Sequence, residues 1–143
     1  MSNNIFYRVK YGLEKELELL LKINNILDDD YVLTKTEDIY CCVDYILTKN
    51  EKIICYIELK SRKNISHFAD LMIGGNKLKS ISLLKHKTIL LWIDGDTFYY
   101  CDFNKKMLEY PTGIICGSNV IYIPKTEMVL GNITSFTKAL NNF

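Results

Sequence analysis

Two apolar runs joined by a short polar stretch constrain this fold more than any other feature of the sequence. The runs are IYCCVDYIL at 39–47 and KIICYIEL at 52–59, and TKNE at 48–51 separates them. Runs rich in Ile, Val and Tyr that are bounded by polar turn residues are typical of paired strands. The sequence therefore predicts a β-hairpin, with Asn50 as the turn residue of positive φ.

Each run contains one acidic residue among apolar neighbours, Asp44 in the first and Glu58 in the second. Burying an unpaired carboxylate is costly, so each implies a compensating partner. With a three-residue turn centred near Glu51, the two residue numbers of each cross-strand pair would add up to 102, so residue 44 would lie opposite residue 58. A two-residue turn would instead make these two residues diagonal neighbours. Lys60 follows Glu58 by two positions and points to the same face of the strand. Three ionisable groups are thus expected at one end of the hairpin.

Two carboxylates this close repel each other unless a proton or a cation lies between them. A divalent metal meets that need, and oxygen ligands favour Mg²⁺, with Mn²⁺ as a substitute. Such a metal can lower the pKa of a bound water and offset charge on a phosphoryl transition state. A neighbouring lysine can orient that water.

Asp44, thirteen intervening residues and then Glu58-Leu59-Lys60 form a pattern that resembles the D-x(n)-E-x-K signature of the PD-(D/E)XK nucleases. Val43 stands at the position of the Pro in that family's name, and this Pro is often absent from its members. The resemblance implies an α/β domain with a restriction-endonuclease-like core, in which a mixed β-sheet is flanked by helices. It implies that Asp44, Glu58 and the backbone carbonyl of Leu59 hold Mg²⁺, and that Lys60 contacts the attacking water or the scissile phosphate.

Further site residues follow from the same resemblance. Many members add a glutamate from the first helix, and Glu16 is the candidate because it falls at the edge of the apolar stripe; the alternative is a solvated side chain. The second helix of many members carries a basic or amide residue, which Asn76 and Lys77 match. Ser61, Arg62 and Lys63 follow the motif and are candidates for contacting the DNA backbone, although Lys63 also fits an exposed loop charge. His67 fits either a general base or a surface histidine.

The rest of the chain predicts a single α/β domain over all 143 residues. Helical periodicity covers 13–27, and a short strand is expected at 31–34. A helix is predicted over 66–84 with Ser66 as its N-cap, and the glycine pair at 74–75 indicates either a close backbone approach or a break. Strands are expected at 88–93, 97–103 and 120–123, with a D-G turn at 94–96 and a final helix over 133–140.

Composition narrows the function without fixing it. The net charge of +1 does not indicate a nucleic-acid-binding protein. Between residues 60 and 87, however, the sequence has seven Lys and Arg residues and one Asp, which form either a phosphate-attracting face or an ordinary solvated surface. Five cysteines without a C-x-x-C pair favour apolar packing in a reducing compartment. No signal peptide or membrane-spanning run is apparent, so a soluble intracellular protein is expected, in cytoplasm or in a host nucleus. Sixteen Lys against two Arg suggest an AT-rich genome, as in some large DNA viruses or some bacteria.

The expected function is a Mg²⁺-dependent endonuclease that acts on DNA, selects structure rather than a long sequence, and takes part in junction resolution, repair or replication. A homodimer fits this reading, since two identical sites can cut two strands. One alternative is a non-catalytic nucleic-acid-binding or protein-interaction module on the same fold. Another is a plain α/β domain in which Glu58 and Lys60 face solvent.

Overall fold

The computed structural model describes residues 2–36 and 43–143, with side chains from residue 14 onward. Its helices and strands, in chain order, are α1 (Ser2–Ile26), β1 (Tyr31–Lys35), β2 (Tyr45–Lys49), β3 (Lys52–Ser61), β4 (Asp70–Gly74), α2 (Gly75–Ile81), β5 (Lys87–Asp94), β6 (Thr97–Asp102), β7 (Thr112–Ile115), β8 (Ser118–Pro124), β9 (Val129–Gly131) and α3 (Ile133–Leu140). Three short 3-10 helices, η1 (Ile65–His67), η2 (Lys105–Glu109) and η3 (Lys125–Glu127), join some of them.

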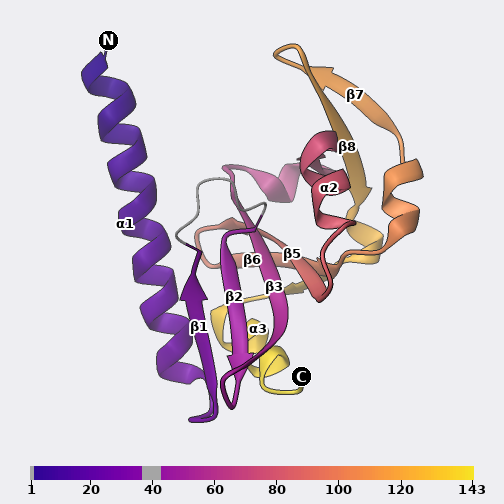
Figure 1. The fold of residues 1–143 in the computed structure, drawn as a ribbon. Coiled ribbons are helices and arrows are strands. Elements are labelled where there is room, and N and C mark those ends of the chain that lie inside the picture. Colours follow the sequence, from indigo (N-terminus) through magenta and orange to yellow (C-terminus); the bar gives the residue numbers. More distant parts are fainter. Residues whose placement is uncertain (1, 37–42) are drawn as a thin grey trace.

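The described strands form two sheets (Figure 1). The larger has six strands in the order β1-β2-β3-β5-β6-β9, in which β3 and β5 run parallel and every other pair is antiparallel. The smaller has three antiparallel strands in the order β4-β8-β7. The fold is therefore α/β with a mixed sheet, as expected.

The hairpin of β2 and β3 has the predicted register beside Asp44, but reaches it differently. Asn50 and Glu51 both have positive φ, 50° and 68°, and form a two-residue turn. A bulge between residues 47 and 48 then inserts one extra residue on the β3 side. Beyond the bulge the residue numbers of each cross-strand pair add up to 102, as for Tyr45 and Ile57. The bulge thus restores the register that a three-residue turn would have given.

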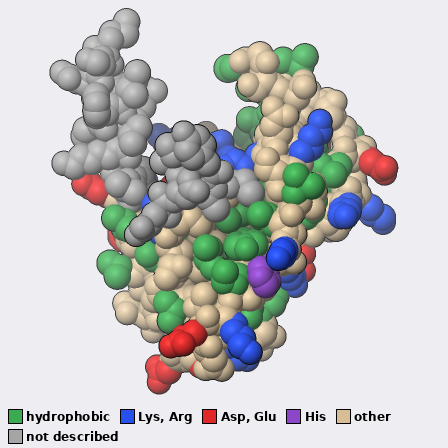
Figure 2. Space-filling model, in the orientation of Figure 1, with side chains coloured by type: hydrophobic (Ala, Val, Ile, Leu, Met, Phe, Trp, Pro, Cys, Tyr) green, Lys and Arg blue, Asp and Glu red, His purple; other side chains and the backbone are tan. Residues whose placement is uncertain are grey.

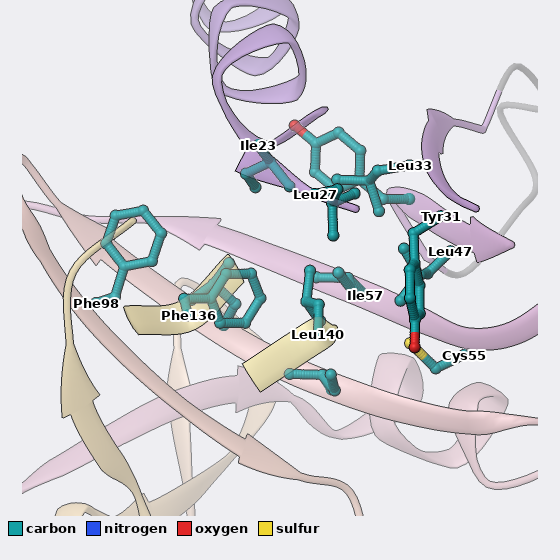
Figure 3. Close-up of a cluster of buried hydrophobic side chains, with 13 residues drawn as sticks. Ile23, Leu27, Tyr31, Leu33, Leu47, Cys55, Ile57, Phe98, Phe136 and Leu140 are labelled. Carbon is teal, nitrogen blue, oxygen red and sulfur yellow. The ribbon is translucent and has the colours of Figure 1, made fainter. Parts of the chain in front are cut away.

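One face of the six-stranded sheet packs against α1 and α3 (Figure 3). Ile23 of α1 and Leu27, directly after this helix, are buried there, whereas Leu17 and Leu21 are 43% and 66% exposed. The buried stripe of α1 therefore leaves out these two leucines. Asn24 lies on this stripe because its side chain donates to the carbonyl of Leu33 at 2.8 Å and accepts from the Leu33 amide at 2.9 Å.

The other face of the same sheet packs against α2 and the three-stranded sheet. Leu90 and Trp92 of β5 are buried in this second core, and the Trp92 indole donates to the carbonyl of Met72 in β4 at 3.1 Å. Leu71 and Ile73 of β4 fill the space between the two sheets. The second core therefore fixes α2 relative to β3 and β5.

The helix predicted over 66–84 is wrong in its first half. That stretch forms η1, then β4, and only then the short helix α2. Its burial alternates, with Leu71 and Ile73 buried and Met72 37% exposed, because β4 pairs with β8. Ser66 lies inside η1 and is not an N-cap. The glycine pair marks the change from strand to helix, with Gly74 as the N-cap of α2.

Other expectations from the sequence are confirmed. Strands occur at the predicted 31–34, 88–93, 97–103 and 120–123 stretches, and α3 has the predicted bounds. The turn at 94–96 joins β5 to β6, with Gly95 at φ 57°. Cys55 and Cys101 are buried as expected, Cys116 is exposed, and the predicted strand residues 39–42, Cys41 and Cys42 among them, lie outside the described residues. No helix in the described part of the chain combines the length and apolarity needed to cross a membrane.

Candidate active site

Asp44 lies immediately before β2 rather than inside a strand, which corrects the prediction from the sequence. Its amide donates to the carbonyl of Ile57 at 3.0 Å, and its carbonyl accepts from the amide of Thr36 at 2.9 Å. Its carboxylate oxygen Oδ2 accepts from the amide of Leu59 at 2.8 Å. Because Asp44 bonds to the residues on both sides of Glu58, its carboxylate is fixed beside that residue.

Glu58 is 2% exposed and lies at the centre of a buried charged cluster. The negative charge of Asp44 lies close enough to raise the pKa of Glu58. Lys60 Nζ lies 3.6 Å from its Oε1, and Lys77 Nζ of α2 lies 3.5 Å from its Oε2. These ion pairs are longer than a normal hydrogen bond, and Oε2 accepts no hydrogen bond from any described residue. Glu58 therefore keeps unused capacity to bind a cation or a proton.

Burial raises the pKa of Glu58 to about 7, and the negative charge of Asp44 acts in the same direction. Lys60 and Lys77 oppose this shift because their positive charges favour the carboxylate. Without a cation beside it, Glu58 therefore binds a proton more readily than an exposed glutamate does.

The two faces of β3 separate the predicted site residues. Glu58 and Lys60 pair in register with Leu90 and Trp92, which belong to the core beneath α2. Leu59, between them, points its side chain to the opposite core beneath α1. Asp44, Glu58 and Lys60 thus converge on the α2 face, as the hairpin register predicts.

Glu16 is not brought to this cluster. Its carboxylate forms an ion pair with Lys35 of β1, and its backbone carbonyl accepts from the Tyr45 hydroxyl at 3.0 Å. Tyr45 belongs to the core on the α1 face, so Glu16 lies across the sheet from Glu58. With Leu59 and Ser61, Glu16 lines a hollow of about 700 Å³ on that face. The structure supports the alternative in which Glu16 is a partly solvated, ion-paired residue.

The candidate nucleic-acid-binding residues occupy two places. Ser61, Arg62 and Lys63 are exposed and continue the chain directly beyond Lys60 at the end of β3. The Arg62 guanidinium donates to the carbonyl of Ser61 at 2.8 Å. Asn76 is exposed on the first turn of α2, whereas Lys77 turns inward to Glu58. His67 is exposed in η1, which favours a surface role.

The donor set near Glu58 fits a hard cation. Two carboxylates provide oxygen ligands, and Glu58 Oε2 has no hydrogen-bond donor among the described residues. The amide of Leu59 points to Asp44, and its carbonyl points to the same side because both groups of a strand residue face one neighbour. No group of three or more His, Cys, Asp or Glu side chains suited to a metal occurs among the described residues. The fit therefore rests on two carboxylates and one backbone carbonyl.

Two features of the site were missed by reasoning from the sequence. Thr36 positions Asp44 from the end of β1: its hydroxyl donates to the carbonyl of Val43 at 2.7 Å and its amide to that of Asp44. Lys77 was expected near the site as a ligand for DNA, but not as an ion-pair partner of Glu58. No local pattern marks either role, because both contacts join residues of different elements and depend on how those elements pack.

Comparison with protein-family models and with curated proteins finds no match for this chain.

Proposed function

We propose that this chain is a metal-dependent endodeoxyribonuclease of the PD-(D/E)XK type. The observation that carries the proposal is the position of Glu58, which is 2% exposed, beside Asp44 and with Lys60 Nζ 3.6 Å from its Oε1 on the same face of β3. A carboxylate buried beside a second one is unfavourable for stability alone, and such pairs occur where charge is used in chemistry.

Asp44, Glu58 and the carbonyl of Leu59 would hold Mg²⁺. When bound, this ion would supply an activated water and neutralise charge on the phosphodiester. The Leu59 amide keeps the carboxylate of Asp44 in place, and the bulged hairpin keeps Glu58 beside it. These residues therefore act by fixing two negative charges at one point before substrate arrives.

Lys60 is the group that reaches the substrate. Its side chain is 22% exposed, so its ammonium group touches both the buried carboxylate and the surface. An ammonium group in that position can orient an attacking water or donate to a developing phosphate oxyanion. Lys77, whose side chain is 33% exposed, neutralises the other oxygen of Glu58 and holds that carboxylate from α2.

DNA is supported as the substrate by the surface next to Lys60. Arg62 and Lys63 are exposed at the end of β3, where they can bind phosphates on either side of the scissile bond. The proposal also has support from the order of elements, because α1, the β1-β2-β3 meander, α2 and β5 follow the order of the nuclease core. The three-stranded sheet is an addition to that order.

A non-catalytic module on the same fold is the second candidate, and one observation favours it. Lys60 and Lys77 both lie beside Glu58, so two positive charges accompany the two acidic residues of the cluster without a metal. The third reading, with Glu58 in solvent, is wrong because Glu58 is 2% exposed.

The proposal is tested with supercoiled plasmid, single strands and four-way junctions in the presence of Mg²⁺, Mn²⁺ or EDTA. Asp44→Asn and Lys60→Met are the informative variants, since Asn retains an acceptor for the Leu59 amide while it removes the charge. Asp96→Asn in the exposed β5–β6 turn is the matched control. Metal-dependent nicking that both site variants abolish and the control retains supports the nuclease.

DNA binding without cleavage, unchanged by Asp44→Asn, would instead identify the non-catalytic module. Cleavage that persists in Asp44→Asn would mean that the activity comes from another site or a contaminant. Isothermal titration of Mn²⁺ into the wild type and Asp44→Asn provides a readout independent of cleavage, with heat expected only for the wild type.

A further inference from the structure

The β7–β8 hairpin projects from the body of the molecule, and its outer strand is the open edge of the three-stranded sheet (Figure 1). All four residues of β7 are exposed or half-buried, with Ile114 at 72% and Ile115 at 42%. Figure 2 shows hydrophobic side chains at the outer end of this hairpin. An exposed edge strand presents unpaired backbone groups to any second strand.

The register of the hairpin identifies which backbone groups of β7 face outward. Tyr122 of β8 donates its amide to the carbonyl of Pro111, so 111 and 122 are a hydrogen-bonded pair. Hydrogen-bonded and non-hydrogen-bonded pairs alternate along an antiparallel ladder. Gly113 and Ile115 therefore bond inward to β8, and the amides and carbonyls of Thr112 and Ile114 point away from the sheet.

The composition of this hairpin lacks the features that protect open edges. Residues 112–123, TGIICGSNVIYI, contain no charged residue and no proline. Edge strands commonly carry lysine, proline or a bulge that prevents pairing with another chain. Two copies of an uncharged strand can pair without like-charge repulsion, so β7 of one chain is suited to pair with β7 of a second chain.

The other sheet edges contrast with β7. The outer edge of β1 is occupied at Leu33 by the side-chain amide of Asn24, which bonds both backbone groups. β9 is only three residues long. At the edge of β4, the carbonyl of Met72 accepts a hydrogen bond from the Trp92 indole. Of these edges, β7 alone combines length, exposure and outward backbone groups.

We propose that two copies of this chain form a homodimer by antiparallel pairing of their β7 strands, with Gly113 of one copy facing Gly113 of the other. In this register Thr112 of each copy is a hydrogen-bonded pair with Ile114 of the other. Each of these two pairs exchanges two backbone hydrogen bonds, and all the outward groups of β7 are satisfied. The two three-stranded sheets become one continuous sheet across a two-fold axis.

Gly113 suits the centre of this interface. A Cβ built on it would lie 2.7 Å from the Tyr122 hydroxyl oxygen, so the Tyr122 ring covers that face of the strand. Position 113 therefore requires glycine, because any side chain there would collide with this ring. The proposal does not depend on the nuclease function, and each can fail without the other.

The first test measures mass in solution by light scattering coupled to size exclusion. The wild type is expected at about twice 16.7 kDa. Ile114→Pro removes one outward amide and leaves the inward bonds of Gly113 and Ile115, so it should be monomeric with an unchanged circular dichroism spectrum. Ile114→Val keeps the amide and is the matched control, which should remain dimeric.

A monomeric wild type at all concentrations would overturn the proposal, as would a folded Ile114→Pro variant that stays dimeric. If the Ile114→Pro variant does not fold, disulfide cross-linking tests the β7–β7 pairing instead. In a Cys116→Ser background, Thr112→Cys together with Ile114→Cys places thiols on residues whose Cα atoms pair at about 5.5 Å, within disulfide range.

The double cysteine variant should give a disulfide-linked dimer on a non-reducing gel, and each single variant should not. Native Cys116 lies three residues from the axis in each copy, roughly 20 Å from its equivalent, so the wild type should not cross-link through it. A double variant that fails to cross-link, or single variants that cross-link equally well, would overturn this register.

Discussion

The two faces of β3 are buried to the same degree but differ in chemistry. On the α1 face Ile57 is 1% exposed within an apolar core, and on the α2 face Glu58, the next residue, is 2% exposed among Asp44, Lys60 and Lys77. Burying an aliphatic side chain contributes about 1.5–3 kcal/mol, whereas a buried ion pair is often no better than an apolar replacement. The α1 face therefore stabilises the strand, and the α2 face is the one on which we propose the active site.

The largest expected effect separates activity from stability at Glu58. Glu58→Gln keeps the shape of the side chain and removes its charge, so nicking should fall by about 10³-fold or more, or about 4 kcal/mol in the barrier. Stability above pH 7 should be unchanged or higher, because the buried charge is gone. Plasmid nicking and urea unfolding measure the two effects. Retained activity would remove the functional distinction between the faces.

The opposite result is expected on the α1 face. Ile57→Ala should lower the free energy of unfolding by about 3 kcal/mol, since it deletes buried methyl groups and leaves a cavity. Nicking per folded molecule should stay close to that of the wild type. Ile53→Ala, on the same strand but 38% exposed, is the control and should cost well under half as much. A small effect at Ile57 would show that the α1 face is not the stabilising one.

The pH dependence of stability should distinguish the faces without any substrate. Because the folded pKa of Glu58 is raised to about 7, the native state binds a proton that the unfolded state releases near pH 4.5. Its stabilising contribution is complete below pH 4.5 and is lost as the pH rises through 7, by roughly 3 kcal/mol in total. The measurement is metal-free urea unfolding from pH 4.5 to 8.5. Glu58→Gln should lack this component, and identical slopes for both proteins would contradict the burial of the charge.

The smallest expected effect concerns Lys77. Lys77→Met removes a positive charge that lowers the pKa of Glu58, so the pH at which stability falls should move upward. The loss of stability at neutral pH should be about 1 kcal/mol or less, because the Lys77 side chain is one-third exposed. Lys79→Met, on the exposed side of α2, is the control and should leave the midpoint unchanged. An equal shift in both variants would mean that Lys77 acts only through net charge.

The candidate site could be predicted in part because its core is local. Asp44, Glu58 and Lys60 lie within one hairpin, and alternation with a period of two places Glu58 and Lys60 on one face. The choice between the two turn lengths could not be predicted: the structure has the two-residue turn, and a bulge at 47–48 restores the opposite pairing that the three-residue turn would have given. The role of Glu16 could not be predicted, because the ion pair with Lys35 depends on how α1 lies against β1.

By itself, the sequence determined the hairpin, the shared face of its charged residues, the buried β5 strand and the bounds of α3, since turn residues and hydrophobic period act over a few neighbouring positions. Only the tertiary structure decided that 70–74 forms a strand, because β4 exists through its pairing with β8 about fifty residues later. It also brought Lys77 to Glu58 and left β7 open at an edge. These outcomes depend on contacts between distant segments, whose free energy no local pattern encodes.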